Sequence, residues 1–359
     1  MTIPKRTWQK GRGALSAPPG RFESVLTEAI DDGWGSLDEP VPAPETTVGA
    51  DSARHVIAWN QSPDVPFDRS INPYRGCEHG CIYCFARPSH AWYGLSPGQD
   101  FETQLFYKHD AARRLEEEIR APKYEPATIT LGANTDPYQP IERSYRITRG
   151  LLEVLAEYRH PVSIVTKGAL VERDLDILQE LAAFNAVSVM VSLTSMDAGL
   201  KRMLEPRAAA PARRLRTIER LSAAGIPVGT LIAPVIPALT DHELEHLLQA
   251  AANAGARSAG YVLLRLPHEV EPLFTEWLRA HYPDRADRVL NHLRDAHGGV
   301  CYDASFGHRM RGSGAYADLL AHRFRVASRR AGIEPSRRIN LSAESFRRPP
   351  RPGDQTELF

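Results

Sequence analysis

Short apolar runs alternate with longer amphipathic stretches along the middle of the chain, and this order predicts a repeated strand–helix pattern. The apolar runs are rich in β-branched residues, as strands are. The stretches between them carry apolar residues at the three- and four-residue spacing of a helix face. Strands are expected at about 69–74, 127–132, 161–168, 186–194, 226–236 and 258–266, and helices at about 144–158, 171–184, 211–224 and 241–254.

Repeated strand–helix units without a reversal predict a parallel sheet covered by helices. The run AVSVMVSLT at 186–194 is apolar on both faces, which is typical of such a strand. Six units are fewer than a closed eightfold barrel needs, so the predicted fold class is α/β, a partial (β/α)6 barrel. Chemistry in barrel folds takes place at the carboxyl ends of the strands. Polar residues that follow predicted strands are Asn134, Thr135, Asp136, Thr166, Lys167, Ser192 and Thr194.

The rest of the chain divides around this body by composition. Residues 1–68 are rich in Pro, Gly and acidic residues and predict an irregular N-terminal arm. The barrel is expected over 69–283. A helical extension is expected over 284–340, followed by a flexible tail over 341–359 that ends in QTELF.

Composition narrows the class of protein. The 359 residues are 42% hydrophobic and 25% charged, with a formal net charge of zero, so any surface for a polyanion must be local. The N-terminus has no apolar stretch typical of a signal peptide. The longest apolar run, 225–239, is broken by prolines and glycines and does not predict a membrane span. A cytoplasmic protein without a membrane partner is expected.

Three of the four cysteines lie within eight residues, in the stretch CEHGCIYC. The spacing of Cys77, Cys81 and Cys84 does not suit a disulfide framework, and it points to metal or redox chemistry. Zinc would need a fourth ligand, for which His79 or His90 could serve. A [4Fe–4S] cluster on three thiolates would instead leave one iron open to a small molecule.

This pattern, with Tyr83 before the last cysteine and a partial barrel around it, resembles the radical S-adenosylmethionine (SAM) superfamily over about residues 69–270. The resemblance implies that a [4Fe–4S] cluster binds and reductively cleaves SAM. It also implies hydrogen abstraction from a substrate and an electron donor such as flavodoxin or ferredoxin. More narrowly, the chain looks like the group related to spore photoproduct lyase. The similar stretches are INPYRGCEHGCIYCFARPSH, NTDPYQPIE, VTKG, VSLT, MLEPR and LIAPVIP.

Carried over by position, the resemblance implies a set of SAM contacts. Thr135 and Asp136 would contact the amino group, Lys167 the carboxylate or ribose, and Ser192 the ribose. Tyr83 would pack beside the adenine. A zwitterionic amino acid requires acceptors for its ammonium group and a cation for its carboxylate, and these residues supply both. Turn chemistry before Pro137 is the alternative for Thr135 and Asp136, and a solvated surface for Lys167.

Three further residues bear on the reaction. Arg207 could pair with Glu205, reach SAM, or be a loop charge. The lyase proper has a cysteine that donates a hydrogen atom to the product radical, and Ala133 stands at the matching position, which puts that reaction in doubt. Cys301 is interpreted as a small buried residue.

Two other motifs remain. HELEH at 242–246 matches a zinc-protease pattern, but both histidines fall on the polar face of the predicted helix, so we reject that interpretation. The arginine-rich segment 301–359 suggests either a solvated tail or a contact with nucleic acid. The ending Gln355–Phe359 resembles the peptide that binds bacterial sliding clamps.

The leading hypothesis is a radical SAM enzyme, with damaged or modified nucleic acid as the substrate class that the resemblance implies. One alternative is an iron–sulfur adaptor that binds nucleic acid or the clamp without turnover. Another is a radical SAM enzyme that acts on a protein or a metabolite.

Overall fold

The computed structural model describes residues 11–23, 45–335 and 340–351. Its main sheet has seven strands in the order β10-β9-β8-β7-β6-β3-β2, and β2 is antiparallel to β3 whereas the other neighbours pair in parallel. All six predicted strands are present, and the fold class is confirmed as α/β with a parallel sheet. The strands of this sheet are β2 (Ala58–Trp59), β3 (Arg69–Ile71), β6 (Ile129–Leu131), β7 (Val162–Thr166), β8 (Val187–Leu193), β9 (Val228–Val235) and β10 (Ser258–Leu263).

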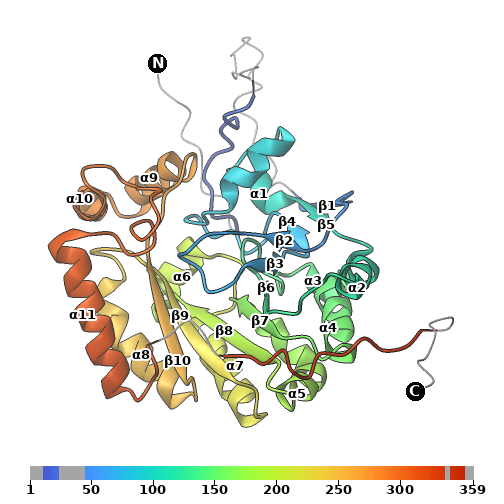
Figure 1. The fold of residues 1–359 in the computed structure, drawn as a ribbon. Coiled ribbons are helices and arrows are strands. Elements are labelled where there is room, and N and C mark those ends of the chain that lie inside the picture. Colours follow the sequence, from blue (N-terminus) through green and yellow to red (C-terminus); the bar gives the residue numbers. More distant parts are fainter. Residues whose placement is uncertain (1–10, 24–44, 336–339, 352–359) are drawn as a thin grey trace.

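Helices surround the strands of the main sheet (Figure 1). Every residue of β8 is buried, as the two-faced apolar run predicted. The α-helices are α1 (Asp100–Thr103), α2 (Ala111–Arg120), α3 (Glu142–Tyr145), α4 (Ile147–Glu157), α5 (Leu175–Ala182), α6 (Ala198–Leu204), α7 (Pro211–Ala223), α8 (Leu244–Asn253), α9 (Val270–His281), α10 (Pro283–Ala296) and α11 (Gly314–Arg330). Short 3₁₀ helices are η1 (Arg87–Tyr93), η2 (Ala169–Asp174) and η3 (Asp241–Glu243).

Helix α8 illustrates how the amphipathic pattern produces the packing. Its buried residues are Leu244, Leu247, Leu248 and Ala251, spaced at three and four positions. Burying one such leucine contributes about 2 kcal/mol. His242 and His246 are exposed, so the rejection of the zinc-protease interpretation is confirmed. No helix in the parts of the chain that the structure describes combines the length and the apolarity needed to cross a membrane.

A second, three-stranded sheet was not predicted. Strand β5 (Gln104–Tyr107) pairs in parallel with β1 (Thr47–Ala50) and antiparallel with β4 (Tyr74–Arg75). Strand β1 belongs to the segment that the sequence predicts as an irregular arm, so this arm differs from the prediction where it is described. Strands β4 and β5 flank the segment that carries the three clustered cysteines, and this small sheet therefore anchors both of its ends.

Residues 340–351 lie against the body instead of forming part of a free tail. The Phe346 ring packs against Tyr124, Tyr158 and His160. Arg348 donates to three backbone carbonyls near the end of α2. Figure 1 shows this segment in red, passing across the molecule near α5 and α4. The predicted clamp-binding residues Gln355–Phe359 lie outside the described residues, and their role stays a prediction.

Candidate active site

The three clustered cysteines open onto one cavity of about 770 Å³. It runs along the inner face of the main sheet, past Met190 and Leu231, to the residues that follow the strands. Cys77, Cys81 and Cys84 lie between β4 and η1. The loop folds on itself, because the Gly80 N–H donates to the Cys77 carbonyl at 3.3 Å and the Cys84 N–H to the Cys81 carbonyl at 3.2 Å.

The described N-terminal segment packs directly under this loop. A Cβ on Gly13 would lie 1.8 Å from the Gly80 carbonyl oxygen, so only glycine permits this approach of two backbones. Gly80 itself has a φ of +66°, which glycine adopts without strain. The Gly13 and Ala14 N–H groups each donate to the Glu102 carboxylate at 2.9 Å. The first described residues of the chain therefore support the cysteine loop.

A buried ion pair fixes the loop from the same side. Arg87 and Glu102 are fully buried, and Arg87 Nη2 donates to Glu102 Oε1 at 2.5 Å. Arg87 Nε also donates to the Cys81 carbonyl at 2.9 Å. Gln139, which follows β6, accepts from the Glu78 N–H at 2.9 Å and donates to the Gly76 carbonyl at 3.1 Å. The loop thus has buried polar partners for its backbone, which position its three thiols.

Tyr83 is held by a buried carboxylate. Its hydroxyl donates to Glu205, which also accepts from Thr194 Oγ1 at 2.7 Å and forms an ion pair with Arg214. Burial raises the pKa of Glu205, but the charges of Arg214 and Lys167 and the hydrogen bonds lower it to about 2. Glu205 is therefore ionised, and it fixes the aromatic ring that directly precedes the third clustered cysteine.

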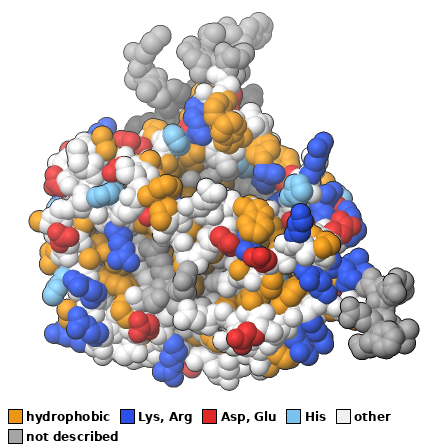
Figure 2. Space-filling model, in the orientation of Figure 1, with side chains coloured by type: hydrophobic (Ala, Val, Ile, Leu, Met, Phe, Trp, Pro, Cys, Tyr) orange, Lys and Arg blue, Asp and Glu red, His pale blue; other side chains and the backbone are white. Residues whose placement is uncertain are grey.

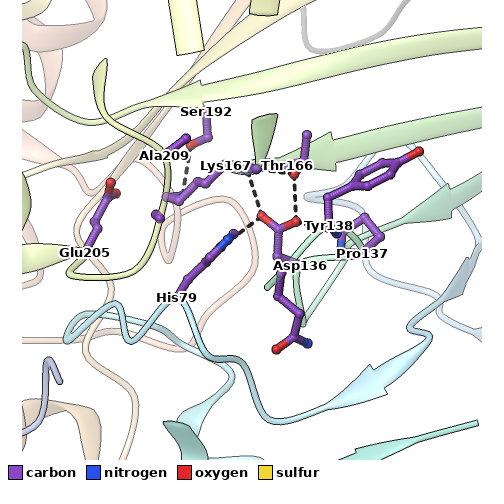
Figure 3. Close-up of polar contacts among 12 residues, drawn as sticks. His79, Asp136, Pro137, Tyr138, Thr166, Lys167, Ser192, Glu205 and Ala209 are labelled. Carbon is purple, nitrogen blue, oxygen red and sulfur yellow. Dashed lines mark hydrogen bonds and ion pairs between the residues drawn. The ribbon is translucent and has the colours of Figure 1, made fainter. Parts of the chain in front are cut away.

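Asp136 joins the end of β7 to the cysteine loop (Figure 3). Its Oδ1 accepts from Thr166 Oγ1 at 2.7 Å, and its Oδ2 from the Lys167 N–H at 2.6 Å. His79 Nδ1 lies 3.3 Å from Oδ2. Burial raises the pKa of Asp136, but the electrostatic interaction with His79 and these hydrogen bonds lower it to about 2. Asp136 lines the cavity, and most of its hydrogen-bonding capacity is already used within the protein.

Lys167 and Ser192 come together at the ends of neighbouring strands. Lys167 Nζ donates to Ser192 Oγ at 3.0 Å, and it lies 5.8 Å from the centroid of the Tyr83 ring. Figure 3 shows the Lys167 side chain extending from beside Asp136 toward Ser192. All four of these predicted residues line the cavity that the cysteines share. This places a cation, a carboxylate, a hydroxyl and an aromatic ring around one space.

Two predicted residues lie elsewhere. The Thr135 hydroxyl donates to the Tyr74 carbonyl at 2.7 Å, and Thr135 does not line the cavity, so its SAM contact stays a prediction. Arg207 pairs with Glu78 at 3.2 Å. Of the alternatives considered for Arg207, the pairing with Glu205 is not found, because Arg214 on α7 occupies that carboxylate. The sequence motif MLEPR contained Glu205, but it could not show which arginine the fold brings there.

The remaining candidates differ in whether they reach the cavity. His90 Nε2 lies 2.9 Å from the Gln104 carbonyl oxygen and outside the cavity lining, whereas His79 lines the cavity. Cys301 is buried and does not line the cavity. Its pKa is raised by burial and by the nearby Glu271. Ala133 also lines the cavity. Among the described cysteines, the cavity therefore meets only the three clustered ones.

The donor set suits an iron–sulfur group that leaves one iron open. Burial is the main cause that raises the pKa of each of the three thiols. The pKa of Cys81 is raised to about 12. Thiolates at these positions would require a cationic metal centre beside them. The same cavity supplies Lys167 for a carboxylate and Ser192 for a hydroxyl-bearing group. The residues present therefore fit both a three-thiolate cluster and a zwitterionic cofactor.

Comparisons with known proteins identify the family of the chain. The sequence pattern of the Radical SAM superfamily matches residues 71–251. An uncharacterised protein of Mycobacterium tuberculosis is 40% identical over 236 residues, which cover 64% of this chain and 69% of the relative. An uncharacterised protein of Methanocaldococcus jannaschii is 30% identical over 221 residues, which cover 62% of this chain and 79% of the relative.

Solved structures of spore photoproduct lyase share the fold. A variant of that enzyme superimposes with a TM-score of 0.55 at 17% identity, covering 80% of each chain. The lyase complexed with dinucleoside spore photoproduct gives 0.55 at 14% identity, also covering 80% of each chain. The superfamily match spans about half of this chain, including the cysteine loop and most of the sheet. The chain therefore belongs to the radical SAM superfamily and is a radical SAM enzyme.

Proposed function

We propose that Cys77, Cys81 and Cys84 hold a [4Fe–4S] cluster and that SAM binds in the adjoining cavity. The observation that carries this proposal is the shared cavity, which brings three thiols, Lys167 and Ser192 together. When bound, the cluster and SAM supply hydrogen abstraction from a substrate, with one electron from a donor such as flavodoxin or ferredoxin. The protein binds and orients the cofactors and keeps water away from them.

Each cavity residue has a distinct part in this proposal. Lys167 Nζ pairs with the SAM carboxylate, and Ser192 Oγ, already bonded to it, reaches the ribose. Tyr83, held by Glu205, packs beside the adenine. Asp136 orients Lys167 through its backbone N–H and accepts from the SAM ammonium group with its remaining capacity. We assign no contact to the Thr135 hydroxyl, because it donates to the Tyr74 carbonyl instead.

Nucleic acid is the substrate class that we propose. The shared fold supports it, because the lyase with that fold has been solved with a dinucleoside photoproduct. Acidic and basic side chains are interspersed over the face shown in Figure 2, so the contact would be local instead of covering a whole face. Ala133 lines the cavity where the lyase has a cysteine, so we do not extend the lyase's way of quenching the product radical to this chain.

Anaerobic reconstitution with iron and sulfide tests the cofactor assignment. Wild-type protein should bind about four irons per chain and release 5′-deoxyadenosine from SAM when reduced with dithionite. Cys77→Ala, Cys81→Ala and Cys84→Ala should each lose both properties. Cys301→Ala is the matched control, because that cysteine lies outside the cavity, and it should keep both. A colourless wild-type protein with one zinc per chain would overturn the assignment.

The substrate class needs a separate test. Oligonucleotides carrying deuterium on base and sugar would be incubated with the reduced enzyme and SAM. Deuterium in the recovered 5′-deoxyadenosine is the expected result, because the abstracted atom is transferred to that product. Formation of 5′-deoxyadenosine that is never deuterated and never stimulated by DNA or RNA would instead favour a protein or metabolite substrate.

A further inference from the structure

A second cation, Arg265, lines the cavity at a different strand end from Lys167. It follows β10 by two residues, whereas Lys167 follows β7. The Arg265 guanidinium carbon lies 4.8 Å from the centroid of the Phe85 ring and 5.8 Å from that of Tyr302. Arg265 Nη2 donates to the Tyr302 hydroxyl at 3.2 Å. Two aromatic rings and one hydrogen bond therefore hold the guanidinium in place at the cavity wall.

This guanidinium has no anionic partner among the described residues. Arg265 forms no ion pair in that part of the chain, and its buried Nε has no hydrogen-bond partner there. The cavity lining includes two carboxylates, but Asp68 pairs with Arg69 and Asp136 with His79. A partly buried charge without a counter-charge is costly to fold. An anion from a ligand would complete the hydrogen bonding and the charge balance.

Phe85 defines the second half of the ligand. It directly follows Cys84, lines the same cavity and is 40% exposed, although large aromatic side chains are usually buried. An exposed aromatic ring is a stacking platform for a planar base, and a neighbouring arginine suits the phosphate attached to such a base. The two residues therefore match one nucleotide unit better than a simple anion or an apolar molecule.

We infer that Arg265 and Phe85 form a subsite for one nucleotide of the substrate, with the phosphate on the guanidinium and the base stacked on the ring. This inference rests on the proposed function, and it adds the substrate group and the residues that hold it. Because Phe85 adjoins Cys84, the bound nucleotide would lie beside the cysteine loop, where a hydrogen atom must be taken. Lys167 and Ser192, which lie at the ends of β7 and β8, keep their proposed contacts with SAM.

The test uses reconstituted protein saturated with SAM and two probes, thymidine 5′-monophosphate and thymidine. A pyrimidine avoids competition for the adenine-binding part of the SAM site. Wild-type protein should bind the monophosphate more tightly than the nucleoside, as measured by calorimetry. Arg265→Gln should weaken monophosphate binding by about tenfold or more and leave thymidine binding unchanged, since a charge-assisted hydrogen bond is lost. Arg265→Lys should bind the monophosphate with an affinity between those of wild type and Arg265→Gln.

Phe85→Leu provides the complementary change. It should weaken the binding of both probes by about five- to a hundredfold, because stacking of the base does not depend on the phosphate. Arg279→Gln, at an exposed position on α9, is the matched surface substitution, and it should change neither affinity. Circular dichroism melting curves check that each variant is folded.

The outcomes separate this inference from the proposed function. If reduced wild-type enzyme forms no 5′-deoxyadenosine from SAM, the proposed function fails by itself. If it does, three results would overturn the subsite: no binding of the monophosphate at millimolar concentration, equal binding to wild type and Arg265→Gln, or weakened SAM binding in Arg265→Gln. The last result would assign Arg265 to the cofactor instead of the substrate.

Discussion

The Asp64 carboxylate binds Arg309 across the open side of the main sheet, 245 positions further along the chain. Asp64 Oδ2 accepts from Arg309 Nε at 2.5 Å, and Oδ1 from the Gly307 N–H at 2.7 Å. Asp64 lies between β2 and β3, at one edge of the sheet. The segment of Arg309 lies at the other edge, where the Leu263 N–H of β10 donates to the Met310 carbonyl at 2.9 Å. This contact therefore joins the two edges of the partial barrel beside the cavity.

Breaking this contact should loosen the side of the cavity. Arg309→Gln leaves the Asp64 carboxylate, whose side chain is 8% exposed, with fewer partners. We expect a loss of about 1–3 kcal/mol in the free energy of unfolding and faster hydrogen exchange over 305–312. Arg323→Gln removes a more exposed pair with Glu245 and should cost less than about 1 kcal/mol. Equal losses of unfolding free energy in the two variants would argue against a role for the Asp64–Arg309 contact in holding the two edges of the sheet together.

The buried Arg87–Glu102 pair should be needed for the cysteine loop. Glu102→Gln leaves the Arg87 guanidinium buried without its counter-charge and should lower the free energy of unfolding by about 3 kcal/mol or more. Iron retained after reconstitution should fall as well, because Arg87 also holds the Cys81 carbonyl. Urea unfolding and iron analysis measure the two effects. The control Glu117→Gln, in an exposed pair with Arg113, should change neither.

Acid should weaken the fold through His160. This buried residue has its Nε2 2.7 Å from the Tyr124 hydroxyl, and burial, with a smaller effect of Arg69, lowers its pKa to about 4. An unfolded histidine titrates near pH 6.5. As the pH falls below about 6.5, the unfolded chain gains a proton that the folded chain does not accept until about pH 4. The free energy of unfolding should therefore fall over this window, by up to about 3 kcal/mol.

Urea unfolding at several pH values, compared between wild type and His160→Gln, measures this contribution. The variant should be less stable near pH 7, because it loses packing against Phe346. Its stability should nevertheless decline less steeply between about pH 6.5 and 4. Parallel declines in the two proteins would show that other groups cause the acid sensitivity.

Lys167 should determine the affinity for SAM. Lys167→Met removes the cation proposed to pair with the SAM carboxylate and keeps the apolar part of the side chain over Tyr83. We expect the dissociation constant for SAM to rise by about ten- to a hundredfold, which corresponds to about 1.4–2.8 kcal/mol. Equilibrium dialysis on reconstituted protein measures it. Lys123→Met, at an exposed position, is the control, and an unchanged affinity in Lys167→Met would remove this residue from the SAM site.

Much of the fold and part of the site follow from local sequence. Strand and helix periodicities reflect which face of each element is buried, and they predicted all six parallel strands and the buried face of α8. Strand ends in a parallel sheet share one edge, which is why Asp136, Lys167 and Ser192 could be predicted to meet. The second sheet was missed, because β1 and β5 are short and pair only through contacts distant in sequence.

The sequence by itself determined the element order, the cysteine spacing and the superfamily, since each depends on residues close together along the chain. Only the tertiary structure decided which side chains meet across it. It turned Thr135 toward Tyr74, paired Glu205 with Arg214 instead of Arg207, and joined the two edges of the open sheet through Asp64 and Arg309. Such pairings depend on distances of a few ångströms between separate elements, and those distances are set by the packing of the whole core.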